Sequence, residues 1–169
     1  MMKTSQNSNR RVAYFGVFAA LALMMSYVEM LIPLPFLVPG MKLGLANVVV
    51  VVALYHMDAK SALFVSVVRI LLAGLLFQGF AGLLYSLSGG LMSLLAMVLL
   101  KKIKGFSIIG VSVVGAVFHN VGQILVAAAV VENLKLFYYL PVLLIFAAVT
   151  GTLIGVVAGR TLALVEKRQ

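Results

Sequence analysis

Long apolar runs, separated by short polar or charged segments, dominate this chain of 169 residues. A helix needs roughly 20 apolar residues to cross the hydrocarbon core of a bilayer. Six runs approach or exceed this length, approximately Val12–Ile32, Met41–Met57, Ser61–Phe80, Gly82–Leu100, Ser107–Val131 and Phe137–Leu164. We therefore predict an all-α integral membrane protein with six transmembrane helices.

Composition supports the membrane class. The chain is 64% hydrophobic and 10% charged, with a mean hydropathy of +1.19. A soluble domain of this size has too little interior to bury so much apolar surface. We expect one transmembrane domain over residues 12–164, between short tails at residues 1–11 and 165–169. Because the second run is short and the last is long, tilt or a broken helix end is expected.

Turn and charge signals separate the runs. Proline and glycine mark the first break, at Pro33, Pro35, Pro39 and Gly40. The later breaks are expected at residues 56–60, 78–82, 101–105 and 132–135. The third and fourth runs are the least clearly separated, since few polar residues lie between them.

Basic residues set the expected orientation, because lysine and arginine concentrate in cytoplasmic segments. With the N-terminus inside, ten basic residues lie inside against two outside, Lys42 and Lys135. The ten are Lys3, Arg10, Arg11, Lys60, Lys101, Lys102, Lys104, Arg160, Lys167 and Arg168. We predict that both termini are cytoplasmic. A cleaved signal peptide is disfavoured, because the first run is too long for one.

The formal charge of +9 does not indicate a nucleic-acid-binding protein. The basic residues lie in short groups between apolar runs, which membrane topology explains. The chain has no cysteine, and its two histidines and few carboxylates do not form the ligand sets that zinc or iron prefer. No metal site is expected.

Arg69 lies near the middle of the third apolar run. An arginine at the centre of a membrane helix costs about 2.5 to 3.5 kcal/mol on insertion scales, so it normally faces a polar cavity or a partner. Acidic residues are few, and Glu29 is the one expected within a span. Three explanations stay open: Glu29 reaches Arg69, backbone and amide oxygens satisfy it, or a ligand does.

Other polar residues inside the runs can be placed by depth. The outer ends hold Glu29, Asn47, Gln78, Tyr85, Ser86 and Ser88, and the middle holds Arg69, His119, Asn120 and Gln123. The inner halves of the second, fourth and sixth runs are nearly all aliphatic or small. This asymmetry predicts a pocket that opens to the outside and is closed toward the cytoplasm.

His119 and Gln123 are four residues apart, so they share one helix face, with Asn120 beside them. Interhelical hydrogen bonding, worth roughly 0.6 kcal/mol per bond in membrane bundles, explains any one of these residues. Together with Arg69 they place four costly groups at one depth, which favours a ligand site. A proton relay through Glu29 and His119 stays open.

Small residues at four-residue spacing predict close helix packing. Gly151, Gly155 and Gly159 share one face of the last run, and we expect this face to pack inside the bundle. Gly16 and Ala20 form a second small face in the first run, where a partner subunit is the alternative to internal packing.

Four segments together resemble a known family: Met41–Asn47, Val68–Ile70, Ser88–Gly90 and His119–Gln123. They are similar to the Gx transporter family, also labelled heptaprenyl diphosphate synthase component I, over nearly the whole chain from about Arg11. That family is grouped with the substrate-binding S components of energy-coupling factor (ECF) transporters. Such components have six membrane helices, bind vitamins or related molecules near the outer face, and dock on a T subunit driven by two ATPases.

The resemblance implies a location in the bacterial cytoplasmic membrane and a role in uptake of a small, anionic or aromatic molecule, such as a vitamin or quinone precursor. It implies docking on the T subunit through Gly16 and Ala20, which are similar to an Ala-x-x-x-Ala motif. From the depth and chemistry of the polar residues, we expect the substrate-binding residues to be Arg69, His119, Asn120, Gln123, Asn47, Glu29, Gln78 and Tyr85. No cofactor is expected in this chain, and ATP would be used by the partner ATPases.

No enzymatic activity is expected. Prenyl diphosphate synthases hold magnesium diphosphate on aspartate-rich motifs, and this chain has one aspartate, Asp58. It also has no Gly-x-x-x-x-Gly-Lys-Ser/Thr loop for ATP. Two alternatives stay open: a non-catalytic membrane partner of a heptaprenyl diphosphate synthase, and a stand-alone secondary carrier that would use Glu29 for ion coupling.

Overall fold

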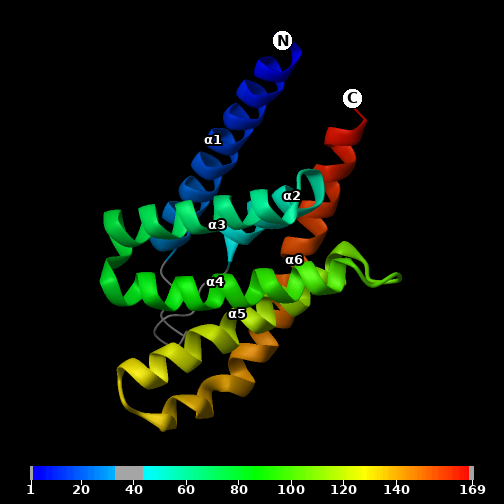
Figure 1. Ribbon diagram of the computed structural model, residues 1–169. Helices are drawn as coiled ribbons and strands as arrows, with labels where there is room; N and C mark the ends of the chain where they lie inside the picture. Colours follow the sequence, from blue (N-terminus) through cyan, green and yellow to red (C-terminus); the bar gives the residue numbers. More distant parts are fainter. Residues whose placement is uncertain (1, 33–43, 168–169) are drawn as a thin grey trace.

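The computed structural model describes the backbone of residues 2–32 and 44–167, and the side chains of residues 12–32 and 44–167. All regular elements in these ranges are helices, as Figure 1 shows, so the all-α prediction is confirmed there. The α-helices are α1 (Met2–Leu31), α2 (Leu45–His56), α3 (Ala59–Ala73), α4 (Gly79–Lys101), α5 (Ile108–Val130) and α6 (Leu140–Glu166). A π-helix, η1 (Gly74–Gln78), precedes α4, and a 3₁₀-helix, η2 (Leu134–Tyr139), precedes α6. The break expected at Pro33–Gly40 and the expected start of the second run at Met41 lie outside the described residues.

In the described part of the chain, four helical runs are long and apolar enough to cross a membrane: Val12–Leu31, Ala59–Lys101, Ile108–Val130 and Leu134–Glu166. The membrane class predicted from the sequence is thereby supported, whereas the count of six spans stays a prediction. The second of these runs folds back on itself, because α3 and α4 lie side by side in opposite directions (Figure 1). Helix α2 has 12 residues, about 18 Å of length, which is shorter than the hydrocarbon core.

The turn between α3 and α4 begins earlier than expected. The helix becomes a π-helix at Gly74, and it ends at Gly79, which has φ 70° and ψ 177°. Glycine adopts this conformation readily, whereas other residues rarely do. Gly82, expected in the break, lies inside α4. Because Leu75, Leu76 and Phe77 are apolar, hydropathy alone gives no signal of a turn here.

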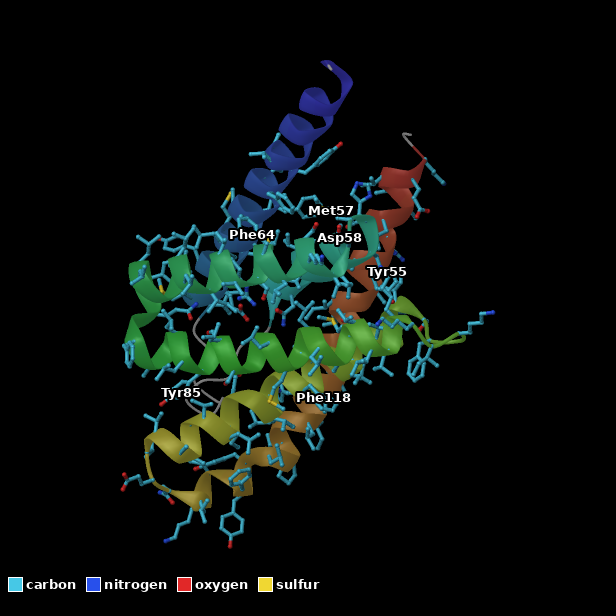
Figure 2. The ribbon with its side chains drawn as sticks, in the orientation of Figure 1. Tyr55, Met57, Asp58, Phe64, Tyr85 and Phe118 are labelled. Atoms are coloured by element: carbon cyan, nitrogen blue, oxygen red, sulfur yellow. The ribbon has the colours of Figure 1, made fainter. Side chains whose placement is uncertain are left out.

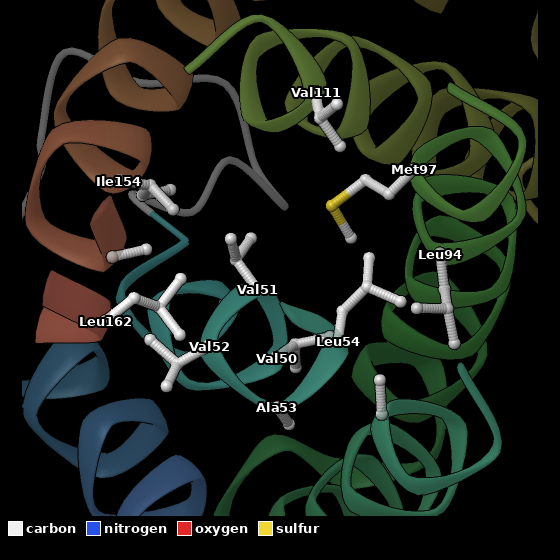
Figure 3. Close-up of a cluster of buried hydrophobic side chains, with 12 residues drawn as sticks. Val50, Val51, Val52, Ala53, Leu54, Leu94, Met97, Val111, Ile154 and Leu162 are labelled. Carbon is white, nitrogen blue, oxygen red and sulfur yellow. The ribbon is translucent and has the colours of Figure 1, made fainter. Parts of the chain in front are cut away.

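Helix α2 forms the centre of the bundle. Residues 49–54 are buried without interruption, which is the behaviour of a helix that is apolar on every side. Helices α1, α3 and α6 pack around it. Figure 3 shows its valines and Leu54 among side chains of other helices, which include Leu94, Met97, Val111, Ile154 and Leu162. The short second run is therefore a core element over residues 49–54.

Two of the three glycines predicted to share a packing face do so. A Cβ at Gly151 would lie 2.7 Å from the Cα of Val113, and one at Gly155 would lie 2.6 Å from the Cα of Ile109. These glycines let α6 approach the backbone of α5. The expectation for Gly159 was wrong, because a Cβ there meets no atom of the described residues within 4 Å.

Candidate functional site

Arg69 lies on α3 with 4% of its surface exposed. Its Nη2 donates to Oδ1 of Asn47 on α2 over 3.0 Å, and its Nη1 donates over 3.5 Å to the hydroxyl of Ser26 on α1. The guanidinium thus joins three helices. An amide oxygen and a hydroxyl oxygen meet part of its hydrogen-bonding need, as one of the three explanations required.

Glu29 supplies the opposite charge. It lies on α1 with 8% of its surface exposed, and its carboxylate attracts the Arg69 guanidinium electrostatically. The same carboxylate accepts a hydrogen bond from the backbone N–H of Gly44, the residue that caps α2. A carboxylate at a helix N-terminus also stabilises the helix dipole. The charge of Glu29 and the amide oxygen of Asn47 therefore both favour a buried Arg69, and the ligand explanation stays open.

Among the described residues, the buried side-chain donors without a hydrogen-bond partner include Nε of Arg69, Nε2 of Gln123 and the hydroxyl of Ser61. A buried donor without an acceptor costs about 1 to 3 kcal/mol, so such groups call for an explanation. Arg69 and Gln123 belong to the candidate site predicted from the sequence, whereas Ser61 lies in the first turn of α3, outside that site.

A small polar cavity lies on the other side of Asn47. Its lining residues come from α2, α5 and α6 and the residue before α2: Gly44, Asn47, Ala116, His119, Asn120, Thr150 and Ile154. Its volume of about 10 Å³ is enough for about one water molecule. The cavity brings three predicted site residues together, and Asn47 connects it to the Arg69 cluster.

The polar residues of α5 divide between two neighbouring helices. Asn120 donates from Nδ2 to the carbonyl oxygen of Leu143 on α6 over 3.0 Å. His119 and Gln123 lie against α4, where a Cβ on Gly89 would be 2.7 Å from the His119 carbonyl oxygen and 2.8 Å from Gln123 Cγ. All three side chains are buried. Interhelical bonding therefore accounts for Asn120 in part, and glycine permits the close approach at His119.

Gln78 and Tyr85 lie near the turn between α3 and α4 (Figure 2 labels Tyr85). Gln78 Oε1 accepts a hydrogen bond from the Ser86 hydroxyl over 3.0 Å, and the Tyr85 carbonyl accepts one from the Ser88 hydroxyl over 3.1 Å. Neither Gln78 nor Tyr85 is among the described residues that line the polar cavity. The structure places them in the antiparallel pair of helices formed by α3 and α4.

Three participants were not singled out from the sequence: Ser26, Gly44 and Thr150. Ser26 also donates to the carbonyl of Ala22, one turn earlier, so a serine in an apolar helix needs no ligand to explain it. Its position three residues before Glu29 was the available signal, because residues at this spacing share a helix face.

The Gly16–Ala20 face of α1 is exposed. A Cβ at Gly16 meets no atom of the described residues within 4 Å. Internal packing, one of the two roles expected for this face, does not occur at Gly16 in the described part of the chain. The partner-docking role stays a prediction.

Comparison with known proteins supports the resemblance found in the motifs. The family described as heptaprenyl diphosphate synthase component I matches residues 18–161. This range holds Asn47, Arg69, His119 and the other candidate binding residues. No curated protein and no solved structure matches the chain.

Proposed function

The chain belongs to the heptaprenyl diphosphate synthase component I family, and we propose from this premise that it is the membrane-embedded substrate-binding subunit of an ECF-type importer. One observation carries the proposal. Polar side chains from α2, α3 and α5 converge in the interior of an apolar bundle, around Asn47. Buried polar groups in a membrane protein are costly and mark ligand sites and pathways.

We propose six crossings with both termini in the cytoplasm of a bacterial cell. The run Ala59–Lys101 has 43 residues, about 65 Å if straight, which is twice the hydrocarbon thickness. Its folding into α3 and α4 supports counting it as two crossings. Together with the other three runs and the short α2, this gives the six of the proposal.

The proposed ligand is small and carries hydrogen-bond acceptors, either anionic or electron-rich. The amide of Asn47, and the donors of Arg69 and Gln123 that lack a partner among the described residues, favour a ligand with hydrogen-bond acceptors. Because Glu29 offsets part of the charge of Arg69, a full negative charge on the ligand is favourable but not required.

The proposed partners are a T subunit and two ATPases that hydrolyse ATP. The open Gly16–Ala20 face supports docking on the T subunit, because small residues allow another helix to approach closely. The chain itself would be non-catalytic.

Affinity purification of the tagged chain from native membranes, followed by mass spectrometry, tests the proposal. We expect recovery of a T subunit with two ATPases. Gly16→Leu should reduce that recovery at least several-fold, while Leu21→Phe, a change at another exposed position of α1, should not.

A second candidate follows from the family description, which suggests a non-catalytic membrane partner of a heptaprenyl diphosphate synthase. Recovery of a soluble prenyl synthase without ATPases would replace our proposal with this one. Recovery of neither would favour a stand-alone carrier.

A further inference from the structure

An apolar groove adjoins the polar cavity. Its lining residues come from α2 and α6: Leu45, Val48, Thr150, Leu153, Ile154 and Val157. Thr150 and Ile154 line both spaces, so the groove and the cavity are direct neighbours. The groove volume of about 160 Å³ is close to that of an apolar cavity that holds one benzene ring.

Gly44 lies at the junction. A Cβ at this position would be 3.2 Å from Asn47 Nδ2 and 3.2 Å from Ile154 Cδ1. Any side chain at this position would crowd both the amide donor of the cavity and the apolar wall of the groove. Since Oδ1 of Asn47 accepts from Arg69, the amide group of Asn47 is the part that remains to donate to a ligand.

The groove lies at the surface of the bundle, which the proposed topology places against the membrane. Leu153 is 61% exposed and Val157 is 50% exposed, and both lie on α6, a helix within one of the candidate spans. In that topology, the hydrocarbon chain of a ligand bound in this groove would be in contact with lipid along one side. The head group at its inner end would meet Asn47, His119 and Asn120.

We infer that the site binds a single-chain amphiphile, with its apolar chain in the groove and one oxygen atom of a small head group, such as a carboxylate, in the polar cavity. This inference rests on the proposed function, whose substrate class it names. The small cavity selects against bulky phospholipid heads. Entry is lateral, from the bilayer, between α2 and α6.

Tryptophan quenching on the purified chain tests the inference without any partner subunit. The chain contains no tryptophan, so Leu153→Trp places a single reporter in the groove. Thr152→Trp is the matched control, at the same depth of α6 but on a different face. The probes are a long-chain fatty acid brominated near its carboxyl end and a brominated alkane of equal length.

We expect saturable quenching of the Leu153→Trp protein by the fatty acid, and only weak, non-saturating quenching of the control. Adding Asn47→Asp keeps an acceptor for Arg69 but removes the amide donor and repels a carboxylate. It should raise the half-quenching concentration about tenfold or more, equivalent to about 1.4 kcal/mol. His119→Phe, in the same background, tests the head-group contact from α5.

Equal quenching of the two tryptophans would overturn the inference, because it would mean that the brominated fatty acid only partitions into the surrounding lipid or detergent. Saturable quenching of equal strength by the headless alkane would also overturn it. The importer proposal is tested separately, by which proteins are recovered with the chain, so failure of one is distinguishable from failure of the other.

Discussion

Arg69 on α3 and Asn47 in the first turn of α2 are joined by a hydrogen bond of 3.0 Å between Nη2 and Oδ1. This bond fixes the beginning of the central helix and determines which end of the amide of Asn47 remains for a ligand. Gly44, just before α2, is held by Glu29. One network of opposite charges thus positions the N-terminus of α2 and the polar cavity beside it.

Replacing Asn47 should separate its structural role from its binding role. Asn47→Leu removes an acceptor from a buried guanidinium, which should lower the free energy of unfolding by about 1 to 3 kcal/mol. Asn47→Asp retains an acceptor and should stay closer to the wild type. Thermal unfolding in detergent, monitored by size-exclusion chromatography, measures the stability of both variants. Equal losses in the two variants would show that the bond to Arg69 does not stabilise the fold.

Glycines on α6 provide a matched pair. A methyl group at Gly155 would overlap the backbone of α5 at Ile109, and overpacking of this kind typically costs about 1 to 3 kcal/mol. Gly159→Ala adds a methyl group in open space and should be neutral, or stabilising by up to about 1 kcal/mol through helix propensity. Thermal unfolding of the two alanine variants should therefore differ in this order. Equal stability would mean that α5 and α6 do not approach as described.

Lys101 stabilises the other end of α2. Its Nζ donates to the carbonyl oxygen of Leu54 over 2.6 Å and lies 4.8 Å from the centre of the Tyr55 ring. A cation near the last carbonyl groups of a helix is favourable. Lys101→Met should lower the unfolding free energy by about 1.5 kcal/mol, the lower end of the range for a hydrogen bond to a charged group. Lys104→Met, at an exposed position, is the control, and a similar loss there would argue against the capping role.

Much of the fold was predictable because apolar periodicity and length are direct signals of membrane helices. The fifth run was expected at Ser107–Val131, and α5 occupies Ile108–Val130. The turn at Gly74 was not located, since a π-helix needs no polar residue. The central position of α2 was also missed, because a continuous apolar run looks the same whether lipid or other helices surround it.

The site was predictable in part. Asn47, His119 and Asn120 line one cavity. Polar side chains in apolar membrane helices usually face the interior of the bundle, because exposing them to lipid is costly. Gln78 was grouped with them by depth, but depth does not fix the direction around a helix, and its contact is with Ser86. Ser26 and Gly44 were missed, since a serine or a glycine carries no strong signal in a hydropathy profile.

Native mass spectrometry of the purified chain, released from mild detergent, tests the central claim most directly. We expect the wild-type protein to carry a small molecule, seen as an additional mass. Arg69→Gln should reduce the bound fraction about tenfold or more, because Arg69 orients the amide of Asn47 and supplies positive charge near the ligand. Ile145→Val, an exposed change on α6 away from the cavity, should leave it unchanged. A wild-type chain without any bound molecule, or an Arg69→Gln variant that retains it in full, would contradict the account.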